Sequence, residues 1–453
     1  MTVTAIFGMH WGDEGKGKIV DILAEKYDII VRYNGGDNAG HTVVTDEEIQ
    51  VASHNIPSSI RHDRKVHVIG NGEVVNLNNL LYSEIEGKEG LLSVGVFPSP
   101  ERLVLSDRAH LILPYYSKVE ERKELSRGIG TTRRGIGVAY MLKADRTGIR
   151  VLDLLDDGAR FIQNVRIHAD EFGLELDPEQ LLEEQRALLK KLQSYLSVQD
   201  TVEFFRKNVG ANVLLEGAQA VLLDLDAGTY PYVTSSSTVP GGSYTGALGI
   251  PPIDNFIGVM KAYVTRVGAG PFPTELGTAA DIENVSKDNP EVLTEKDIER
   301  AVKGDSLAVG KFIRAKGKEY GASTGRPRRA GWQDLVVAQY ALNVVGGPQR
   351  FRYSVAVTKL DILDGLPEIK VCTRYGKTGH FPSNTNLLYD VDPQFETLPG
   401  WNNTSGVTDY KKLDGNAKAY IEFIHRYLDV PVSTVSTGPK RGDTIQQVLP
   451  DVY

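Results

Sequence analysis

A glycine-rich loop close to the N-terminus constrains the fold of this chain more than any other feature. The apolar run Val3–Phe7 ends at Gly8, and Gly12–Lys18 then fits the pattern G-x-x-x-x-G-K. Glycines let backbone N–H groups approach a phosphate, and a helix that begins after such a loop favours the anion. The apolar positions of Lys18–Lys26 suit a helix packed on a sheet. A strand, a phosphate-binding loop and a helix are therefore expected to open the chain.

This loop departs from an ordinary phosphate loop at one position. Ile19 follows Lys18, where a serine or threonine hydroxyl normally binds Mg²⁺. A metal would need another ligand here, and Asp13 lies inside the loop. A glycine-rich turn without a ligand is the alternative interpretation. Four glycines, two lysines and two carboxylates within the eleven residues Gly8–Lys18 favour a nucleotide site.

A second glycine-rich loop, Asn34–Thr42, follows the predicted strand Asp28–Tyr33. Strand, loop, helix and strand make a βαβ unit, which implies a parallel sheet with a right-handed crossover. Both loops then open at the carboxyl edge of the sheet, where parallel sheets bind ligands. Asn38 can donate a hydrogen bond, and His41 can serve as acid or base near neutral pH. A lone histidine is more often structural, so His41 depends on this setting for a functional interpretation.

The segment Thr358-Lys359-Leu360-Asp361, after the apolar residues Ser354–Val357, resembles the element with which GTP-binding proteins read guanine. A carboxylate accepts hydrogen bonds only, so it can take both the N1–H and the 2-amino hydrogens of guanine. Adenine has no such pair of donors. The lysine stem can cover the face of the base. Together with a phosphate loop, this motif favours GTP over ATP.

Further polar segments indicate a pocket for more than one substrate. Gly321–Arg329 carries three arginines in four positions beside Ser-Thr-Gly, which suits carboxylate or phosphate recognition, although a solvated basic loop is the alternative. Four other segments rich in small and polar residues could each be a plain turn, but together they favour a substrate pocket. They are Gly128–Gly137, Glu216–Gln219, Thr229–Ser236 and Arg266–Gly270.

The remaining pattern alternates apolar strands with helices, which predicts an α/β fold with a large, mostly parallel central sheet flanked by helices. Further strands are expected at Lys65–Ile69, Arg102–Leu105, Asn212–Glu216, Ser354–Thr358 and Val432–Ser436, and helices at Tyr115–Arg127, Pro178–Lys207, Asp334–Val345 and Ala417–Tyr427. No repeat or linker divides the chain. We expect one domain over residues 1–453, in which the charged segment 281–318 is a surface insertion of one or two short helices.

Composition excludes several other classes of protein. Hydrophobic residues are 41 % and charged residues 24 % of the chain, as in globular proteins. The net charge of −8 argues against non-specific nucleic-acid binding. No apolar run approaches the ~20 residues of a membrane helix, and the N-terminus is expected to be a strand rather than a signal peptide. The single cysteine, Cys372, favours a reducing, cytoplasmic location.

Taken together, the motifs closely resemble those of the adenylosuccinate synthetase family. The resembling stretches are Trp11–Lys18, Gly35–Thr42, Gly130–Gly137, Glu216–Gln219, Gly228–Ser236, Thr265–Glu275, Thr324–Arg326, Thr358–Gly365 and Ser436–Pro439, in the expected order. The resemblance implies a P-loop-like GTP-binding architecture with smaller subdomains, usually as a homodimer. It also implies a ligase of purine biosynthesis that uses GTP and Mg²⁺ to join L-aspartate to IMP through 6-phosphoryl-IMP, giving adenylosuccinate, GDP and phosphate.

The same resemblance implies residue roles. Asp13 would be the catalytic base and contact Mg²⁺ together with Gly40, and His41 would stabilise charge on the leaving GDP. The implied GTP and metal site comprises Gly12, Glu14, Gly15, Lys16, Gly17, Lys18, Gly40, Thr42, Arg328, Lys359, Asp361, Ser436 and Gly438. The implied IMP and aspartate site comprises Asn38, Thr132, Arg146, Gln219, Thr234, Val267, Thr324 and Arg326. Arg146 would reach the active site of the neighbouring subunit, and Arg326 would bind the aspartate carboxylate.

Three features depart from the family pattern: Asp37, which adds a negative charge near the expected IMP site, the pair Arg133-Arg134, and the segment 281–318. A paralogue acting on another purine nucleotide, such as dGMP, is the main alternative. Such a relative would be expected to change the catalytic base, and Asp13 is retained. A GTP-binding regulator is a third hypothesis, but it would need a hydroxyl at the position of Ile19.

Overall fold

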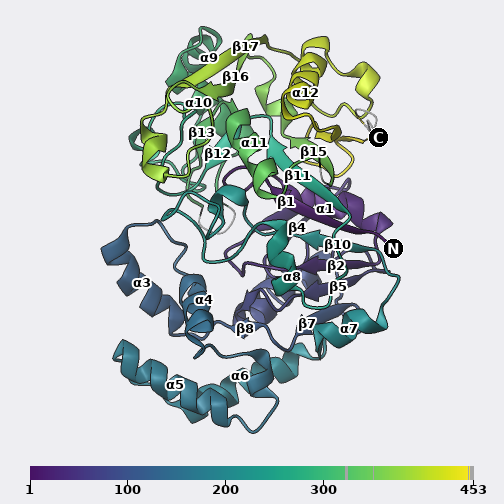
Figure 1. Ribbon diagram of the computed structural model, residues 1–453, viewed down its shortest axis with the longest axis vertical. Coiled ribbons are helices and arrows are strands. Elements are labelled where there is room, and N and C mark those ends of the chain that lie inside the picture. Colours follow the sequence, from purple (N-terminus) through teal and green to yellow (C-terminus); the bar gives the residue numbers. More distant parts are fainter. Residues whose placement is uncertain (322–324, 350, 447, 449–453) are drawn as a thin grey trace.

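The computed structural model describes residues 1–321, 325–349, 351–446 and 448. A ten-stranded sheet crosses the middle of the molecule (Figure 1). Its strands lie in the order β19 (Thr444–Gln446), β18 (Val432–Ser436), β15 (Arg352–Thr358), β11 (Asn255–Lys261), β1 (Val3–Gly8), β10 (Val213–Glu216), β2 (Ile29–Arg32), β5 (Val66–Ile69), β7 (Leu103–Ser106) and β9 (Ser197–Gln199). All neighbours are parallel except β18 and β19. The expected mostly parallel α/β sheet is confirmed.

The central strands are buried on both faces, as parallel strands covered by helices must be. All six residues of β1 are buried. Helix α1 (Lys16–Leu23) packs Ile19 and Val20 against one face of the sheet, where they meet Ile6 of β1. The apolar side chains of the first strand and the first helix therefore fix the loop between them.

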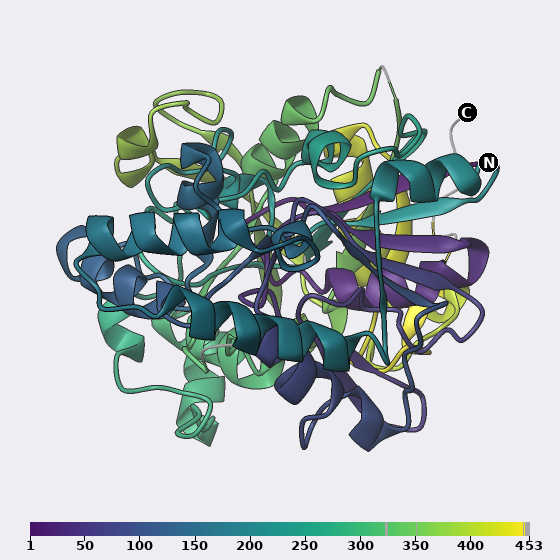
Figure 2. The ribbon, with the colours of Figure 1, turned by 90° about the horizontal axis from the view of Figure 1, so that it is seen from below.

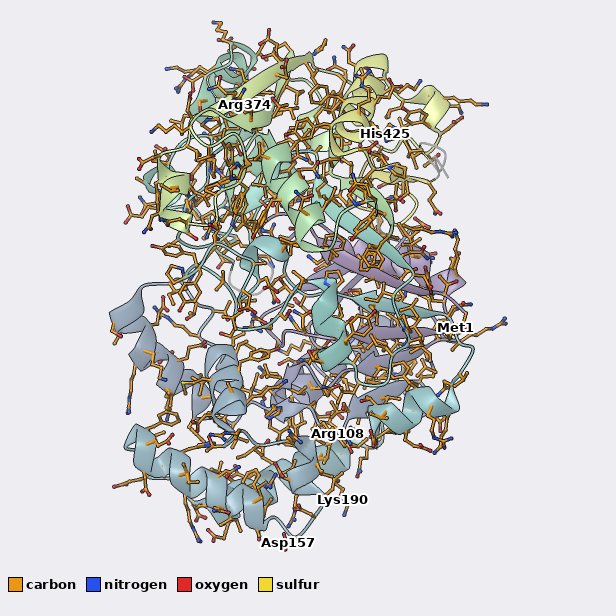
Figure 3. The ribbon with its side chains drawn as sticks, viewed as in Figure 1. Met1, Arg108, Asp157, Lys190, Arg374 and His425 are labelled. Carbon is orange, nitrogen blue, oxygen red and sulfur yellow. The ribbon has the colours of Figure 1, made fainter. Side chains whose placement is uncertain are left out.

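Two lobes extend from the sheet (Figure 1). The lower lobe holds α3 (Tyr116–Arg127), α4 (Ile136–Asp145), α5 (Ala159–Phe172) and α6 (Pro178–Leu192), and the upper lobe holds α9 (Glu295–Val302), α10 (Ser306–Gly317), α11 (Leu335–Val344) and α12 (Gly415–Leu428). From below, α5 and α6 lie in front (Figure 2). Asp157 and Arg374 mark opposite ends of the molecule (Figure 3). Among the described residues, no helix combines the length and the apolar character needed to cross a bilayer.

Short elements complete the chain around the two lobes. A small sheet joins β14 (Gln333–Asp334), β16 (Glu368–Tyr375) and β17 (Pro393–Pro399), and two-stranded sheets join β3 (His41–Val44) to β4 (Gln50–Ser53), β6 (Val74–Val75) to β8 (His110–Leu111), and β12 (Val264–Arg266) to β13 (Arg329–Gly331). The short helices are α2 (Leu77–Asn79), α7 (Thr201–Lys207) and α8 (Ser243–Gly246).

The prediction of one helical stretch over Pro178–Lys207 is wrong. Helix α6 ends at Leu192, Ser197–Gln199 pair with β7 as the edge strand β9, and α7 begins after Asp200. The Asp200 side chain accepts a hydrogen bond from the Val202 N–H and so starts a new helix. The apolar spacing of this segment indicates a helix, but pairing with the edge strand β7 keeps Ser197–Gln199 extended.

The charged segment 281–318 contains the helices α9 and α10, within the expected number. Ala301 is the buried residue of α9, whereas Val309, Phe312 and Ile313 of α10 belong to the main hydrophobic core. A surface position therefore describes α9 better than α10. The ten-stranded sheet contributes side chains to all three apolar clusters, which supports treating the chain as one domain; that division stays a prediction.

Candidate active site

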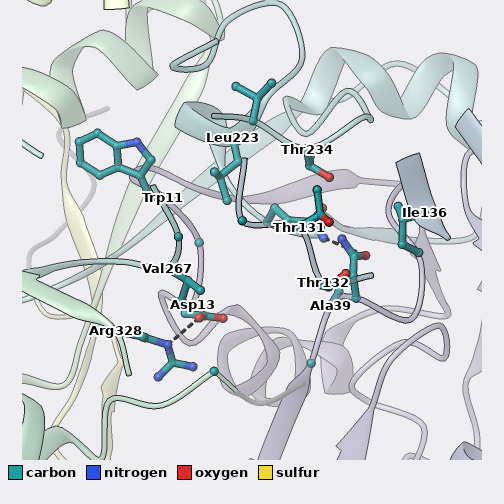
Figure 4. Close-up of a pocket in the computed structure, with 18 of the residues that line it drawn as sticks. Trp11, Asp13, Ala39, Thr131, Thr132, Ile136, Leu223, Thr234, Val267 and Arg328 are labelled. Carbon is teal, nitrogen blue, oxygen red and sulfur yellow. Dashed lines mark hydrogen bonds and ion pairs between the residues drawn. The ribbon is translucent and has the colours of Figure 1, made fainter. Parts of the chain in front are cut away.

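A cavity of about 410 Å³ lies at the carboxyl ends of the central strands (Figure 4). Loops that follow β1, β2, β10 and β15 supply much of its wall. The predicted site residues that line it are Gly12, Asp13, Gly15, Lys16, Gly17, Asn38, Gly40, His41, Thr42, Thr132, Gln219, Thr234, Val267, Arg328 and Lys359. Residues distant in sequence thus meet where a parallel sheet is expected to bind its ligands.

The strands of the first βαβ unit are not neighbours, because β10 lies between β1 and β2. The last residue of β10, Glu216, therefore lies between the two glycine-rich loops and is fully buried. Its Oε1 accepts a hydrogen bond from Arg32 Nη1 at 2.7 Å, and its Oε2 accepts one from the Ser58 N–H at 2.9 Å. Sequence reasoning placed Glu216 in a polar segment but gave it no role.

The imidazole ring of His41 contacts the Glu216 carboxylate. Its Nδ1 makes a short contact with Glu216 Oε1 and lies 2.8 Å from Ser58 Oγ. Burial and the nearby Arg32 cation lower the pKa of His41 to about 4, against the pull of Glu216. Burial alone would raise the pKa of Glu216, but Arg32 and His41 lower it to about 2. Because the Glu216 carboxylate is ionised and can only accept, His41 Nδ1 must carry the proton. The Nε2 atom of neutral His41 is then unprotonated and takes no part in the contact with Glu216.

Asp13 projects into the cavity and is paired with Arg328, whose Nε donates to Asp13 Oδ2 at 2.6 Å (Figure 4). Burial opposes ionisation, but Arg328, Lys261 and Lys16 together lower the pKa of Asp13. The backbone of Asp13 has φ 61°, a left-handed conformation that costs on the order of 1 kcal/mol for a non-glycine residue. The surrounding contacts hold this carboxylate in place, ionised at neutral pH.

The first loop is shaped from within by Glu14, which is buried and does not line the cavity. Its Oε1 accepts from the Gly12 N–H and its Oε2 from Lys16 Nζ, both at 2.8 Å. A Cβ on Gly8 would lie 2.4 Å from Glu14 Oε2, so only glycine fits there. Helix α1 begins at Lys16 after left-handed Gly15, so its N-terminus forms part of the cavity wall. That terminus is suited to a phosphate.

The guanine-type motif is attached directly to this loop. Thr358 Oγ1 donates to the carbonyl oxygen of Glu14 at 2.6 Å. Lys18 Nζ donates to Ser436 Oγ at 2.8 Å and to the Gly438 carbonyl at 2.9 Å. Burial lowers the pKa of Lys18 to about 8, although Asp443 and Asp361 oppose the change. Lys18, Asp361, Ser436 and Gly438 do not line the 410 Å³ cavity; they form a second group beside Lys359.

The opposite side of the cavity is polar and has unused hydrogen-bonding capacity. Gln219 Nε2 donates to Asn38 Oδ1 at 3.4 Å, and Thr132 and Thr234 line the same wall. Thr131 Oγ1 and Gln219 Oε1 are buried without a hydrogen-bond partner among the described residues. Buried polar atoms are normally satisfied, so these two atoms mark a place for a polar ligand. Thr131 was not singled out from sequence; its position beside Thr132 was the available signal.

The remaining predicted residues lie farther out. Arg326 is exposed, and its Nη1 donates to the Gly130 carbonyl at 3.2 Å. Arg146 is exposed at the end of α4 with φ 70°, and it does not line the cavity. Thr324 lies outside the described residues. The third arginine of this segment, Arg329, pairs with Glu275 instead.

Two of the sequence departures, Asp37 and the pair Arg133-Arg134, meet at the edge of the site; Asp37 is buried, whereas Arg133 is exposed and Arg134 is partly buried. The carboxylate of Asp37 does not line the cavity; it accepts a hydrogen bond from Asn79 Nδ2. Its backbone carbonyl accepts from Arg134 Nη1 at 2.6 Å. The added negative charge is therefore turned toward Asn79 and Arg134 and does not line the cavity.

These features define an enzyme class that binds a guanine nucleotide at a phosphate loop and a second polar substrate beside it. A family profile for adenylosuccinate synthetase matches residues 5–445. The adenylosuccinate synthetase of Thermodesulfovibrio yellowstonii is 43 % identical over 99 % of this chain and 100 % of its own, and that of Salinibacter ruber is 44 % identical over 99 % of each. The chain belongs to the adenylosuccinate synthetase family. It is a GTP-dependent ligase that joins L-aspartate to IMP.

Solved structures agree with this assignment. The structure of the fully ligated adenylosuccinate synthetase of Plasmodium falciparum is 36 % identical to this chain, with a TM-score of 0.82. The match covers 98 % of this chain and all of the Plasmodium falciparum chain. The succinoaminodeoxyadenylate synthetase of cyanophage S-2L, bound to dGMP and dATP, has a TM-score of 0.58 at 18 % identity, with coverage of 98 % and 95 %. That second likeness shows the fold alone. The alternative of a dGMP-specific enzyme therefore has no support beyond the fold.

Proposed function

We propose that Asp13 and His41 carry out the first half of the reaction. Asp13 takes the N1 proton of IMP, and O6 attacks the γ-phosphorus of GTP. GDP leaves, and 6-phosphoryl-IMP forms. The amine of aspartate then displaces the phosphate from C6, which gives adenylosuccinate. The observation that carries the proposal is that Asp13, His41, Lys16 and Gln219 share one cavity at the carboxyl edge of the sheet.

The ionised carboxylate of Asp13 is suited to a base that takes its proton while the phosphoryl group is being transferred. Its lowered pKa keeps it ionised at neutral pH, and Arg328 occupies Oδ2. A carboxylate with a low pKa is a weak base, so proton removal from N1 must be driven by the developing O6–phosphorus bond. Oδ1 then serves as the acceptor nearest the substrate while Arg328 fixes the orientation of the carboxylate.

His41 contributes as a cation that forms when the nucleotide binds. Glu216 holds one proton on Nδ1, so Nε2 of the neutral ring is an acceptor and must take up a second proton before it can donate to a phosphate. Binding of a triphosphate raises the proton affinity of the ring, because anionic oxygens replace water near it. The resulting imidazolium stabilises charge that develops on departing GDP.

The two nucleotide ends are bound by different groups. Gly15, Lys16, Gly17 and the start of α1 are suited to the phosphates of GTP. Asp361 accepts the two donors of guanine, with Lys359 against the base and Ser436 and Gly438 beside it. Thr42 and Arg328 complete the phosphate end, and Glu14, Gly12 and Lys18 hold the loop and the guanine segment in register.

Mg²⁺ fits the residues present. No group of three or more histidine, cysteine, aspartate or glutamate side chains suited to a metal occurs within the described part of the chain. Mg²⁺ commonly uses one or two carboxylates together with substrate phosphates, so a full protein cage is not required. Asp13 and the backbone carbonyl of Gly40 would hold it. When bound, the ion neutralises charge on the phosphates that are transferred.

The second substrates are proposed to bind on the polar wall. Asn38, Thr132, Gln219 and Thr234 would hold IMP, and the unpartnered oxygen of Gln219 supports this assignment. Val267, Thr324 and Arg326 would receive aspartate, with the guanidinium of Arg326 on its carboxylate. We propose a homodimer in which Arg146 reaches the neighbouring IMP site; its exposure supports this. A cytoplasmic location is proposed from the single, buried Cys372.

Isotope scrambling tests the first half of the mechanism without the second. GTP labelled with ¹⁸O in the β,γ-bridge is incubated with IMP and Mg²⁺ but no aspartate, and the label is followed by ³¹P NMR or mass spectrometry. The proposal expects the label to move into non-bridging β positions, because GDP rotates after reversible transfer. Scrambling should disappear without IMP and in Asp13→Asn. Scrambling in Asp13→Asn at the wild-type rate would refute the assignment of the base.

Product analysis is the companion measurement. IMP, dIMP, GMP and dGMP are each offered with aspartate, Mg²⁺ and either GTP or ATP. Adenylosuccinate from IMP with GTP is expected as the main product. A succinylated 2-amino product formed in preference would contradict the choice of nucleotide.

A further inference from the structure

Glu319 lies just beyond α10 and has no role in the reaction as described so far. Its carboxylate is fully buried, yet it does not line the cavity. Four donors from three segments of the chain meet on it. Lys261 Nζ is at 2.9 Å from Oε2, Arg328 Nη1 at 2.7 Å from Oε2, Lys359 Nζ at 2.7 Å from Oε1, and the Tyr263 hydroxyl also contacts Oε1.

Two of these donors belong to the proposed active site. Lys359 is the lysine of the guanine-type motif, and Arg328 is the arginine on Asp13. Arg328 divides its guanidinium between two carboxylates, with Nε on Asp13 and Nη1 on Glu319. The Glu319 carboxylate therefore connects Lys359, which is proposed to contact guanine, with Arg328, which holds the proposed catalytic base Asp13.

The charge balance explains why an ionised carboxylate is needed at this point. Lys261, Arg328 and Lys359 place three basic groups around Glu319, and Asp13 also pairs with Arg328. Burial lowers the pKa of Lys261 to about 7, so the other two groups are the permanent cations. Burial alone would raise the pKa of Glu319, but the three basic groups hold it well below the ordinary range. A neutral residue here would leave Lys359 and Arg328 to repel each other, since Glu319 alone among the described residues forms an ion pair with both.

The contact with Glu319 fixes the direction of the Lys359 side chain. Its backbone has φ 59°, the left-handed region that non-glycine residues avoid. Its Nζ is tied to Glu319 Oε1 and to the Gly317 carbonyl at 2.9 Å, so the stem is laid out in one direction beside the cavity. A lysine held at its tip presents its methylene stem as a fixed apolar surface, which suits packing on a purine ring.

We propose that Glu319 is a positioning residue that sets Lys359 for the guanine nucleotide and Arg328 for Asp13, and so determines GTP affinity from outside the cavity. This inference rests on the proposed function, because it uses the roles given there to Lys359 and Arg328. Glu319 itself does not line the cavity.

The test is Glu319→Gln in the full-length enzyme, with GDP affinity measured by calorimetry and KM values measured for each substrate. An amide presents one acceptor and one donor, so it cannot receive both cations. We expect GDP affinity to fall and KM for GTP to rise by about 10- to 100-fold, the effect of misplacing a binding group by about 1 Å. KM for IMP should stay within about twofold, because the residues proposed for IMP make no contact with Glu319.

This pattern separates positioning from a merely structural role. Loss of folded enzyme would lower kcat and leave every KM unchanged, and that result would overturn the inference. So would unchanged GDP affinity in a folded Glu319→Gln enzyme. GDP binding needs no turnover, so a failure of the isotope-scrambling test in wild-type enzyme would be recognised separately.

A second variant separates positioning from charge balance. Lys261 contacts Glu319 but does not line the cavity. The double variant Glu319→Gln/Lys261→Met removes one buried charge of each sign. We expect its thermal stability to recover relative to the single variant, while its GDP affinity stays low. Recovery of GDP affinity would show that Glu319 only balances charge, and would refute the proposal.

If Glu319→Gln does not fold, Glu319→Asp decides the question. It keeps the charge but shortens the side chain by one methylene, so the carboxylate cannot reach the same donors together. We expect weaker GDP binding with KM for IMP unchanged. GDP affinity equal to wild type would count against the inference.

Discussion

Asp361 makes the most selective chemical demand of any single residue in this site. Its carboxylate can accept from both the N1–H and the 2-amino group of guanine, whereas an asparagine offers one acceptor and one donor. We therefore expect Asp361→Asn to raise KM for GTP by about 10-fold or more. ITP lacks the 2-amino group, so its KM should change much less. Steady-state kinetics with both nucleotides measures the ratio directly.

Glu422→Gln is a suitable control for this substitution, because it removes a carboxylate on α12 that lines no cavity described above. Its GTP-to-ITP preference should match wild type. An unchanged preference in Asp361→Asn would rule out the guanine-reading role.

At the residue scale, the sequence predicted many of the groups that line the cavity and missed those that hold them in place. Asp13, His41 and Gln219 belong to short motifs whose composition reveals a ligand. Arg32 and Ser58, which contact both His41 and Glu216, lie outside these motifs. Glu319 likewise precedes the arginine-rich loop without a motif of its own. Such contacts depend on strand order, which spacing along the chain does not contain.

Strands show the same limit at the scale of elements. The first strand and helix follow from an apolar run and a glycine-rich loop. Strand β11 occupies the middle of the sheet and was not predicted. Gly258 interrupts its apolar run, and it is glycine because a Cβ there would lie 2.5 Å from Met9 Sδ. A packing requirement between neighbouring strands therefore weakened the local signal.

The segment that contains α9 and α10 is expected to support the loop proposed to bind aspartate. The Lys287 N–H donates to the Gly325 carbonyl at 2.9 Å, which joins this segment to that loop. Arg314 of α10 forms two hydrogen bonds with Glu291, at 2.7 and 2.8 Å, and both side chains are less than one-tenth exposed. Breaking a buried pair by removing one charge costs about 3–5 kcal/mol.

We therefore expect Glu291→Gln to lower the thermal midpoint by several degrees and to raise KM for aspartate, with KM for GTP nearly unchanged. The matched control is Glu179→Gln, which removes an exposed ion pair with Arg166. That variant should behave as wild type in both measurements. A lowered midpoint with KM for aspartate unchanged would contradict the supporting role and leave only a structural one.

The whole molecule should lose stability as the pH falls below about 6.5. Burial lowers the pKa of five histidines: His10, His41 and His168 to about 4, and His67 and His110 to about 3. Their unfolded values lie near 6.5, so the unfolded chain takes up protons first and is favoured as the pH falls. Glu73 and Asp334 act in the opposite direction, because burial raises the pKa of Glu73 well above its ordinary value and that of Asp334 to about 6.

Urea unfolding at pH 7.5, 6.5 and 5.5 tests this prediction through His67→Gln. His67 is fully buried, so its removal should make stability less dependent on pH, by up to about 1.4 kcal/mol per pH unit below pH 6.5. His380→Gln changes an exposed histidine and serves as the control. If both variants keep the wild-type pH dependence, His67 does not titrate differently in the folded and unfolded chains.

Assembly is the largest-scale prediction, and it follows from where Arg146 lies. An exposed arginine outside the cavity can act on IMP only if a second copy brings it there, as a two-fold symmetric dimer would. Asp13→Ala and Arg146→Leu should each be nearly inactive alone. In a mixed dimer, one of the two sites combines an intact Asp13 with an intact Arg146. An equimolar, fully exchanged mixture should therefore regain about a quarter of wild-type activity. Because Asp13→Ala disables every site on its own chain, a mixture with no more activity than its separate components would show that Arg146 does not act across an interface.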